Sequence, residues 1–392
     1  MLPVDLPGTV RDALLAPLVD HHCHGVRRDD LSRAAFELLV NEGGSPAPPG
    51  TTHFDTAFGM AVRRWCAPVL DLEPHAPPAV YVSRREELGA AEVNRRLLAG
   101  AGVVAFLVDG GADGVGDADL LTATEMGRHG GAAADELVRV ERIERAVAES
   151  APLAVDYLDG LGDALAARAA KAVAFKSVAG ALCGLDFDPA RPSRGSVIAA
   201  ANRRLSDPKR PLTDEVLLRH LLWSAVDAAR ERGLPLQLHA GFRPAAPGET
   251  SLPWVDLHRA DPGRLNEFAG LVQPLGVPIV LLHCYPYHRQ AAYLASLHPH
   301  VYVDAGLAPP HAAAASARVM AELLELAPFH KLLYGSACHG VAETGYLGAL
   351  HYRQALGAAL GARLAAGEWS PADAARVAHM IGSGNARRVY RL

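Results

Sequence analysis

The segment "VDHHCHG", residues 19–25, carries three polar side chains at a spacing of two residues: Asp20, His22 and His24. On a β-strand this spacing points all three side chains to the same face. Two imidazoles on one face of a strand end can share a metal ion, because the neutral histidine ring is the commonest metal ligand in proteins. The segment therefore predicts a metal site, and the alternative is a polar strand end with solvated histidines.

Three further apolar runs end in a lysine or a histidine. Lys176 follows "AVAF", His239 follows "PLQL" and His283 follows "PIVLL". A buried ammonium group is costly without a partner, but a lysine carboxylated by CO2 is an anionic ligand that bridges two metals, and burial and nearby cations favour that modification. Taken singly, a salt-bridged lysine or a hydrogen-bonded core histidine explains each residue. The joint pattern favours a metal site, with Asp304 at the end of another run supporting neighbouring side chains.

The elements that position these residues are short apolar runs bounded by Gly, Pro, Asp or His, typical of strands buried on both faces. Segments with helical character, such as "LLRHLLWSAVDAARERG", lie between them. The alternation predicts an α/β fold, a (β/α)8 TIM-type barrel. An open doubly wound sheet is the alternative, but "LVDGGADGVG" lacks its Gly-x-Gly-x-x-Gly turn. The eight runs centre near residues 20, 105, 138, 174, 237, 281, 302 and 333.

Two connections are too long for plain loops, which predicts helical insertions after strands 1 and 4. These two connections span about residues 30–100 and 180–212. In a barrel both follow the carboxyl end of a strand, so we expect both on the active-site face, the first one capping it. With no internal repeat, residues 1–392 are predicted to form a single barrel domain.

Composition excludes several classes of partner. The net charge is −5 without a basic tract, which argues against nucleic acid. No apolar run approaches the roughly 20 residues of a membrane span, and the first residues do not read as a signal peptide. The five cysteines are scattered without a Cys-x-x-Cys pair, which predicts reduced thiols in a cytoplasmic protein.

Over nearly its whole length the sequence resembles the amidohydrolase superfamily, in particular the amidohydrolase-related branch that also occurs fused to glutamine-synthetase-like domains. The resemblance implies a (β/α)8 barrel with one or two divalent metal ions. It also implies that His22 and His24 bind one metal, that His239 and His283 bind the other, and that Lys176 is the carboxylated bridge. The segments that carry it are "DHHCHG", "LVDGG", "VRVERIE", "FKSVAGALCGLDF", "LQLHAGF", "LLHCYPYHRQAAYLA", "HVYVDAGL", "KLLYGS" and "NARRVY".

The turn after the eighth predicted strand departs from the family pattern. The family has a Gly-Ser-Asp turn whose aspartate binds metal and accepts a proton, whereas here the turn is "GSA" with Ala337. A methyl group does neither. Three accounts remain: Cys338 or His339 takes over, the reaction does not need the aspartate, or the protein is an inactive relative kept for binding.

Other residues are candidates for catalysis or for the wall of a substrate pocket. Glu141 ends the third predicted strand and resembles an acidic residue of the family; a helix-initiating Glu is the alternative. Glu343 matches an acidic position of the family turn and is expected to contact a substrate amine. Arg243 is a candidate to bind a substrate carboxylate as a bidentate donor, with a surface arginine in a loop as the alternative, and Tyr285 and His288 are expected to line the pocket.

The sequence as a whole predicts a metal-dependent hydrolase acting on carbon–nitrogen bonds of a small polar amide, amine or carboxylate. Zinc is the expected metal, and iron, manganese and copper remain alternatives. His283 would stabilise the oxyanion, and His339 or Cys338 would replace the missing proton acceptor. A metal-assisted lyase, decarboxylase or rearrangement, or an inactive binding protein, is the alternative. A homodimer is a family-level expectation.

Overall fold

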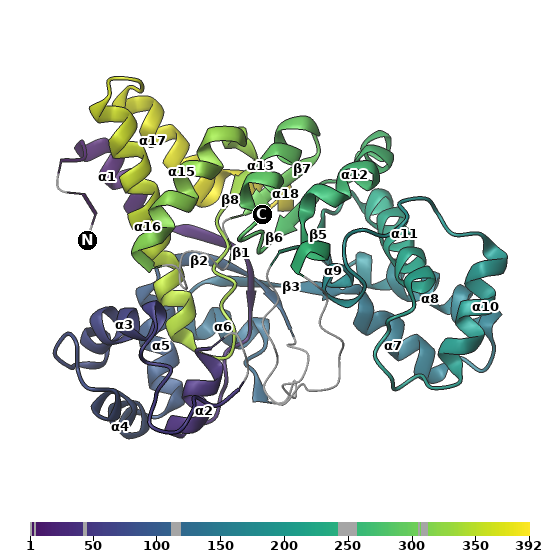
Figure 1. The fold of residues 1–392 in the computed structure, drawn as a ribbon, viewed down its shortest axis with the longest axis horizontal. Coiled ribbons are helices and arrows are strands. Elements are labelled where there is room, and N and C mark those ends of the chain that lie inside the picture. The colour runs from purple at the N-terminus through teal and green to yellow at the C-terminus, as the bar shows by residue number, and fades with distance from the viewer. Residues whose placement is uncertain are drawn as a thin grey trace.

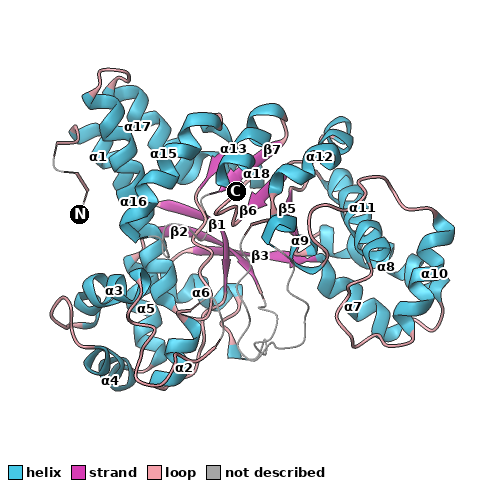
Figure 2. Ribbon diagram, in the orientation of Figure 1, coloured by secondary structure: helices cyan, strands magenta, loops and turns pink. Residues whose placement is uncertain are grey.

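Eight parallel strands form one sheet whose order follows the chain, β1 to β8. In Figure 2 the strands lie in the middle of the molecule and helices surround them. This is the predicted (β/α)8 barrel. The computed structural model describes residues 2–3, 5–41, 45–110, 119–241, 257–304, 306 and 313–392. The strands are β1 (Leu18–His24), β2 (Val103–Asp109), β3 (Ala133–Arg139), β4 (Ala174–Ser177), β5 (Leu236–His239), β6 (Ile279–Leu282), β7 (Val301–Asp304) and β8 (Leu332–Leu333).

Strands β4, β5 and β6 are buried along their entire length, and β6 (IVLL) is accordingly all apolar, whereas β4 and β5 also carry buried polar residues such as Lys176, Gln237 and His239. Parallel pairing sets the carboxyl ends of neighbouring strands side by side. His24 is the register partner of Asp109, and Arg139 is the partner of Lys176. Polar residues at successive strand ends are therefore collected at one end of the barrel.

The segment that follows β8 closes the barrel against β1. The backbone N–H of His21 donates to the carbonyl of Tyr334 at 3.1 Å, that of Ala337 to His22 at 3.0 Å, and that of His24 to Cys338 at 2.6 Å. These bonds make the turn after β8 part of the barrel wall.

The helices fit the predicted alternation, and their ends follow local sequence signals. Asp214 caps α11 by accepting from two backbone N–H groups, and Gly233 ends that helix with φ of +65°. Gly89, with φ of +75°, divides a segment predicted as helical into α4 and α5. The helices are α1 (Gly8–Leu15), α2 (Arg33–Leu39), α3 (Ala57–Ala61), α4 (Pro78–Leu88), α5 (Ala90–Gly100), α6 (Ala123–Gly130), α7 (Val140–Ser150), α8 (Ala154–Ala169), α9 (Ala179–Leu182), α10 (Arg194–Leu205), α11 (Glu215–Arg232), α12 (Asn266–Val272), α13 (His288–Leu297), α15 (Ser316–Leu326), α16 (Ala342–Ala365), α17 (Pro371–His379) and α18 (Asn385–Tyr390).

The last helix, α18, completes the apolar interior of the barrel. Its residues Ala386, Val389 and Tyr390 belong to one buried cluster with inward-facing side chains of six strands, among them Val19 and Val280. The barrel is therefore filled partly by its own strands and partly by residues from the far end of the sequence.

The segment between β1 and β2 contains α2 to α5, which lie together beside α16 in Figure 1. A buried ion pair joins this group to the barrel: Arg85 Nε of α4 donates to Glu343 Oε1 of α16 at 2.7 Å, and the Tyr81 hydroxyl donates to the same oxygen at 2.7 Å. The exposed fractions of the Arg85 and Glu343 side chains are 6% and 0%, so water does not screen the pair.

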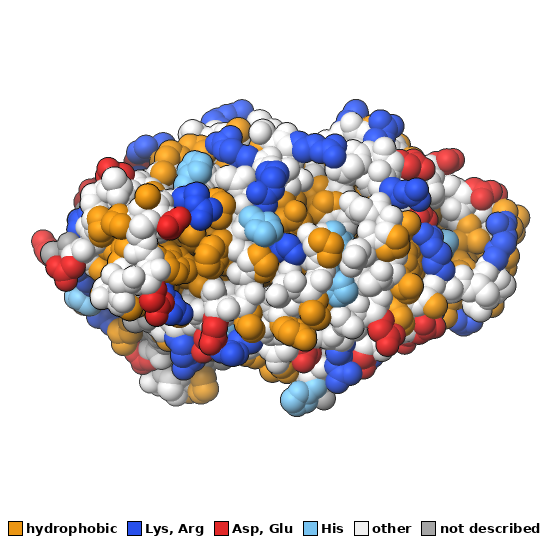
Figure 3. All heavy atoms as spheres, turned by 90° about the horizontal axis from the view of Figure 1, so that it is seen from above, with side chains coloured by type: hydrophobic (Ala, Val, Ile, Leu, Met, Phe, Trp, Pro, Cys, Tyr) orange, Lys and Arg blue, Asp and Glu red, His pale blue; other side chains and the backbone are white. Residues whose placement is uncertain are grey.

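Basic, acidic and hydrophobic side chains all appear on the face shown in Figure 3. None of the helices in the described part of the chain combines the length and hydropathy that a membrane crossing requires.

The Arg85–Glu343 pair gives a test of how the α2–α5 group is held. Glu343→Ala leaves the Arg85 guanidinium buried without its carboxylate, so we expect a loss of about 3–5 kcal/mol in the free energy of unfolding. Glu325→Ala is the control, because its pair with Arg289 is half exposed and is expected to contribute about 0–1 kcal/mol. Urea denaturation measures both, and equal losses would contradict the buried role of Glu343.

Candidate metal centre

Lys176 lies at the centre of the candidate site, with an exposed fraction of 1%. Its Nζ is 3.2 Å from His22 Nε2 and 3.4 Å from His24 Nε2. It is also 2.8 Å from Asp109 Oδ2. Two imidazole nitrogens and a carboxylate thus converge on the point that the lysine nitrogen occupies.

The other two predicted ligands extend this group. The ring centroid of His283 lies 4.9 Å from that of His22 and 5.0 Å from that of His239. The rings of His22 and His24 are 5.1 Å apart. The structure therefore brings together all five predicted metal residues, from the ends of β1, β4, β5 and β6.

The predicted common face of Asp20, His22 and His24 is wrong for Asp20. Between Asp20 and Cys23, β1 uses one residue more than β2, since their register partners are Phe106 and Val108. Such a bulge redirects side chains. Asp20 accepts instead from the Ser336 backbone N–H at 2.9 Å and from its hydroxyl at 2.5 Å, so it holds the turn after β8. Burial raises the pKa of Asp20 to about 6.

Asp109 and Arg139 are functional candidates that the sequence reasoning missed. Burial by itself would raise the pKa of Asp109, but the charges of Arg139 and Lys176 outweigh it and hold that pKa well below its usual range. Arg139 Nε donates to Asp109 Oδ2 at 3.1 Å. Asp109 ends the apolar, largely buried strand β2, so the rule that singled out Lys176 would also have found it. Arg139 ends β3, of which only the last three residues are buried, so the rule does not extend to it.

The histidines are held as neutral rings, the form that binds metal. Burial, and then the charge of Lys176, lower the pKa of His22 and His24 far below the usual value. Burial and the neighbouring His239 do the same for His283. The Nδ1 atoms of His22 and His283 are buried, and no described residue satisfies them.

These donors fit a divalent metal by type, because clustered neutral imidazoles and a carboxylate suit zinc and similar ions. Within the described ranges, however, no group of three or more His, Cys, Asp or Glu side chains is arranged to hold an ion. Lys176 Nζ lies within 3.4 Å of Nε2 of both His22 and His24.

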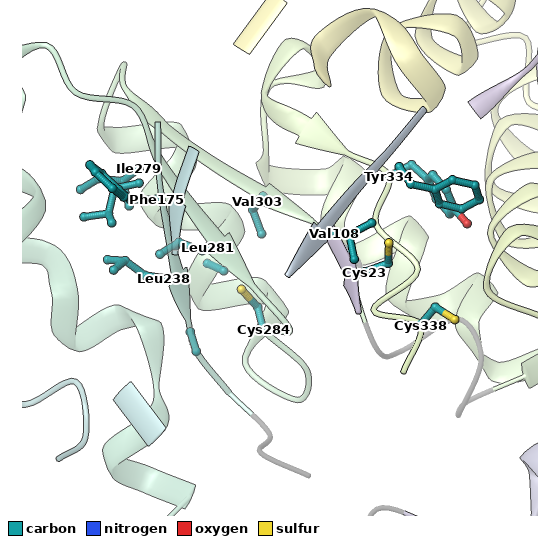
Figure 4. Packing of buried hydrophobic residues seen from close by; sticks show 14 of the residues in the cluster. Cys23, Val108, Phe175, Leu238, Ile279, Leu281, Cys284, Val303, Tyr334 and Cys338 are labelled. Atoms are coloured by element: carbon teal, nitrogen blue, oxygen red, sulfur yellow. The ribbon is translucent and has the colours of Figure 1, made fainter. Parts of the chain in front are cut away.

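In the turn after β8, Cys338 and His339 face different surroundings. The Cys338 thiol is buried, with Sγ 3.6 Å from the Val341 carbonyl, and burial raises its pKa. Figure 4 shows it with the buried hydrophobic residues of the core. By contrast, His339 is near enough to His24 and His283 that its charge would lower the pKa of both. Ala337 adopts a left-handed φ of +51°, which costs an alanine roughly 1–2 kcal/mol.

Glu141 lies in the first turn of α7, so its prediction as the end of the third strand is wrong; β3 ends at Arg139. Its Oε1 accepts from the Ser177 hydroxyl at 2.5 Å and from the Val178 backbone at 2.9 Å. Its Oε2 is buried and unmatched by any described donor. Burial raises the pKa of Glu141 to about 7. This carboxylate is therefore adjacent to the residue that follows Lys176.

The predicted substrate-binding residues are dispersed. Tyr285 and His288 stack with centroids 5.8 Å apart, and His288 Nε2 is 2.6 Å from Glu322 Oε2 of α15. Glu343 is engaged by Arg85 and Tyr81, away from solvent. Arg243 lies outside the described residues.

A (β/α)8 barrel with buried histidines and a lysine at the carboxyl ends of its strands defines the class: barrels that collect polar residues at the end where barrel enzymes have their active sites. Within this class the chain belongs to the amidohydrolase family, whose profile matches residues 100–392.

Known proteins similar to this chain differ in what they are named for. Protein fluG of Emericella nidulans is 26% identical over 421 residues, which cover 96% of this chain and 46% of fluG. The chain thus spans less than half of that relative. A protein from Lactobacillus casei named as a metal-dependent hydrolase has a TM-score of 0.83 at 22% identity and covers 98% of both chains. The uronate isomerase of Thermotoga maritima has a TM-score of 0.63 at 15% identity and covers 97% of both.

The burial of Cys338 can be tested by its reactivity. All five cysteines are free and buried, so we expect the native protein to react with iodoacetamide at pH 8 far more slowly than the unfolded chain. Mass spectrometry of labelled peptides measures each thiol. Rapid native labelling of Cys338, with the other four cysteines as internal controls, would show a thiol open to the site.

Proposed function

We propose that the protein is a metal-dependent hydrolase of the amidohydrolase family that acts on a carbon–nitrogen bond of a small polar substrate bearing an amide, amine or carboxylate. The observation that carries the proposal is the convergence of His22 and His24 on Lys176 at the barrel end where His239 and His283 also lie. A purely structural core would not need four adjoining histidines, three of which (His22, His24 and His283) have a buried Nδ1 that no described residue satisfies.

His22, His24, His239 and His283 would hold the metal, with zinc as the expected ion. Carboxylation of Lys176 would turn the group at the centre of the site from a competing cation into a ligand. It requires the neutral amine, which burial favours and the 2.8 Å contact with Asp109 opposes. When bound, a divalent metal supplies Lewis acidity that polarises a carbonyl group and acidifies water.

The chain's own residues would then move protons. We assign the acceptor role of the missing aspartate to His339, because the Cys338 thiol is buried against the core and His339 lies near enough to His24 and His283 to affect their pKa. Glu141 would protonate the leaving group, since a carboxyl with a pKa of about 7 retains its proton in a substantial fraction of molecules at neutral pH.

A second candidate is an isomerase, lyase or decarboxylase on the same barrel. Ala337 favours it, because such a reaction does not need the aspartate, and the likeness to uronate isomerases shows that the fold is compatible with it. Turnover in 18O-labelled water separates the two, since hydrolysis places solvent oxygen in the acyl product. An inactive binding protein would show no turnover.

The metal proposal predicts stoichiometric zinc that survives dialysis. Replacing a residue that only hydrogen-bonds to a metal ligand lowers metal affinity roughly 10–100-fold. Removing a ligand itself, as in His22→Ala or His239→Ala, is therefore expected to lower zinc affinity at least as much. Elemental analysis of the purified proteins measures this, with His129→Ala of α6 as the control. Wild-type protein that holds no zinc, iron, manganese or copper after loading and dialysis would contradict the proposal.

The assignment of Glu141 predicts the pH dependence of activity. Its pKa is raised to about 7, so the proton it donates is present below that pH and is lost as the pH rises through it. We expect kcat to fall as the pH rises through about 7. Glu141→Gln is expected to reduce kcat by about 100-fold or more and to abolish this decrease of kcat with pH.

Steady-state kinetics on an amide found by substrate screening measures the Glu141 effect. Glu136→Gln is the matched control, because this exposed carboxylate of β3 pairs with Arg168 at the surface. If kcat of Glu141→Gln still falls as the pH rises through about 7, another group donates the proton.

A further inference from the structure

The backbone of His283 is held in an unusual conformation. Its φ is +58°, in the left-handed region that side chains with a Cβ rarely adopt. His283 directly follows β6, so this conformation sets the direction in which its ring leaves the strand. A residue in such a conformation persists only where its surroundings enforce it.

Asp304, at the end of β7, supplies one such constraint. The His283 backbone N–H donates to Asp304 Oδ1 at 3.1 Å. Two glycines press on the same backbone: a Cβ at Gly241 would lie 2.6 Å from the His283 carbonyl oxygen, and one at Gly306 would lie 3.1 Å from its Cα. The space around His283 is therefore closed, and Asp304 fixes its N–H within that space.

Asp304 is itself held by a buried network that leads to α18. Its Oδ2 is 3.1 Å from His21 Nε2, and His21 Nδ1 is 3.0 Å from the Tyr390 hydroxyl. Gln237 Nε2 donates to the same hydroxyl at 2.8 Å and to the His21 carbonyl at 2.9 Å. The side chains of His21 and Asp304 have no exposed surface.

The donors and acceptors of this network are mutually consistent. The Tyr390 hydroxyl accepts from the Gln237 amide, so its own proton is free to go to His21 Nδ1. A neutral His21 then carries its proton on Nε2 and donates it to Asp304. The hydrogen bonds therefore run from Tyr390 of α18 through His21 and Asp304 to the backbone of His283, and each residue orients the next one.

We infer that Asp304 and His21, braced by the Tyr390 hydroxyl, form a positioning unit that holds the backbone of His283 in its left-handed conformation. The relevance to metal binding rests on the proposed function, in which His283 is a ligand. The structural part of the inference does not depend on it. Tyr390 and His21 touch neither substrate nor metal, and act through Asp304.

Hydrogen exchange of the His283 amide tests the structural part directly. Asp304→Ala removes its acceptor, and Asp304→Asn restores an acceptor oxygen, so we expect fast exchange in the first variant and recovered protection in the second. Tyr390→Phe is expected to accelerate exchange at His283 roughly five- to tenfold, the effect of one hydrogen bond. Tyr352→Phe is the matched control, because its hydroxyl is buried in the described structure without a hydrogen-bond partner.

Mass spectrometry of the peptide that spans β6 and His283 resolves this amide from the rest. Acceleration confined to that peptide and to those carrying His21 and Asp304 supports the inference. Unchanged exchange at His283 in both Asp304→Ala and Tyr390→Phe overturns it, and so does equal acceleration over the whole barrel, which signals a global loss of stability. If Asp304→Ala does not fold, the comparison of His283 exchange in Tyr390→Phe with that in Tyr352→Phe decides whether the inference holds.

Zinc titration of Tyr390→Phe gives the functional arm, with affinity expected to fall roughly tenfold as for other outer-shell changes. If the wild-type protein binds no metal, the proposed function fails while the exchange result stands. If zinc binds but its affinity is the same in Tyr390→Phe and Tyr352→Phe, the positioning of a ligand by this unit is refuted.

Discussion

A buried ammonium group that requires a negative partner organises the candidate site. Lys176 is almost inaccessible to water, and the Asp109 carboxylate lies within ion-pair distance of it. Asp109 in turn is shared with Arg139, so one carboxylate pairs with two cations from the neighbouring strands β3 and β4 in a medium of low polarity. The lowered pKa of His22 and His24 follows first from their burial and then from the positive charge of Lys176 beside them.

The sequence was sufficient to predict the barrel and to place the histidines and Lys176 at one end of it. Two elementary regularities account for this success. Strands buried on both faces must be apolar, and parallel strands linked by helices bring their carboxyl ends to the same side. A polar residue that ends such a strand, like His239 or His283, is therefore placed at the site by its position on the strand, whatever rotamer its side chain adopts.

What the sequence could not provide depends on local backbone geometry. One extra residue in β1 turns Asp20 toward Ser336 and His21 into the barrel, and no periodicity of two anticipates it. The thiol of Cys338 packs into the core, while the adjacent His339 lies near enough to His24 and His283 to affect their pKa, a distinction set by a turn. Glu141 shows the same limit, because the boundary between β3 and α7 decides whether it ends a strand or begins a helix.

The hydrogen bond between His21 and Tyr390 joins residues 369 positions apart in the sequence. Contacts of such long range form late in folding, because the chain between them must first be ordered. During synthesis the histidines of β1 therefore emerge long before the helix that secures their surroundings. An incompletely made chain therefore holds His22 and His24 but lacks the helix that supports their surroundings, so this end of the barrel is complete only when the barrel has closed around α18.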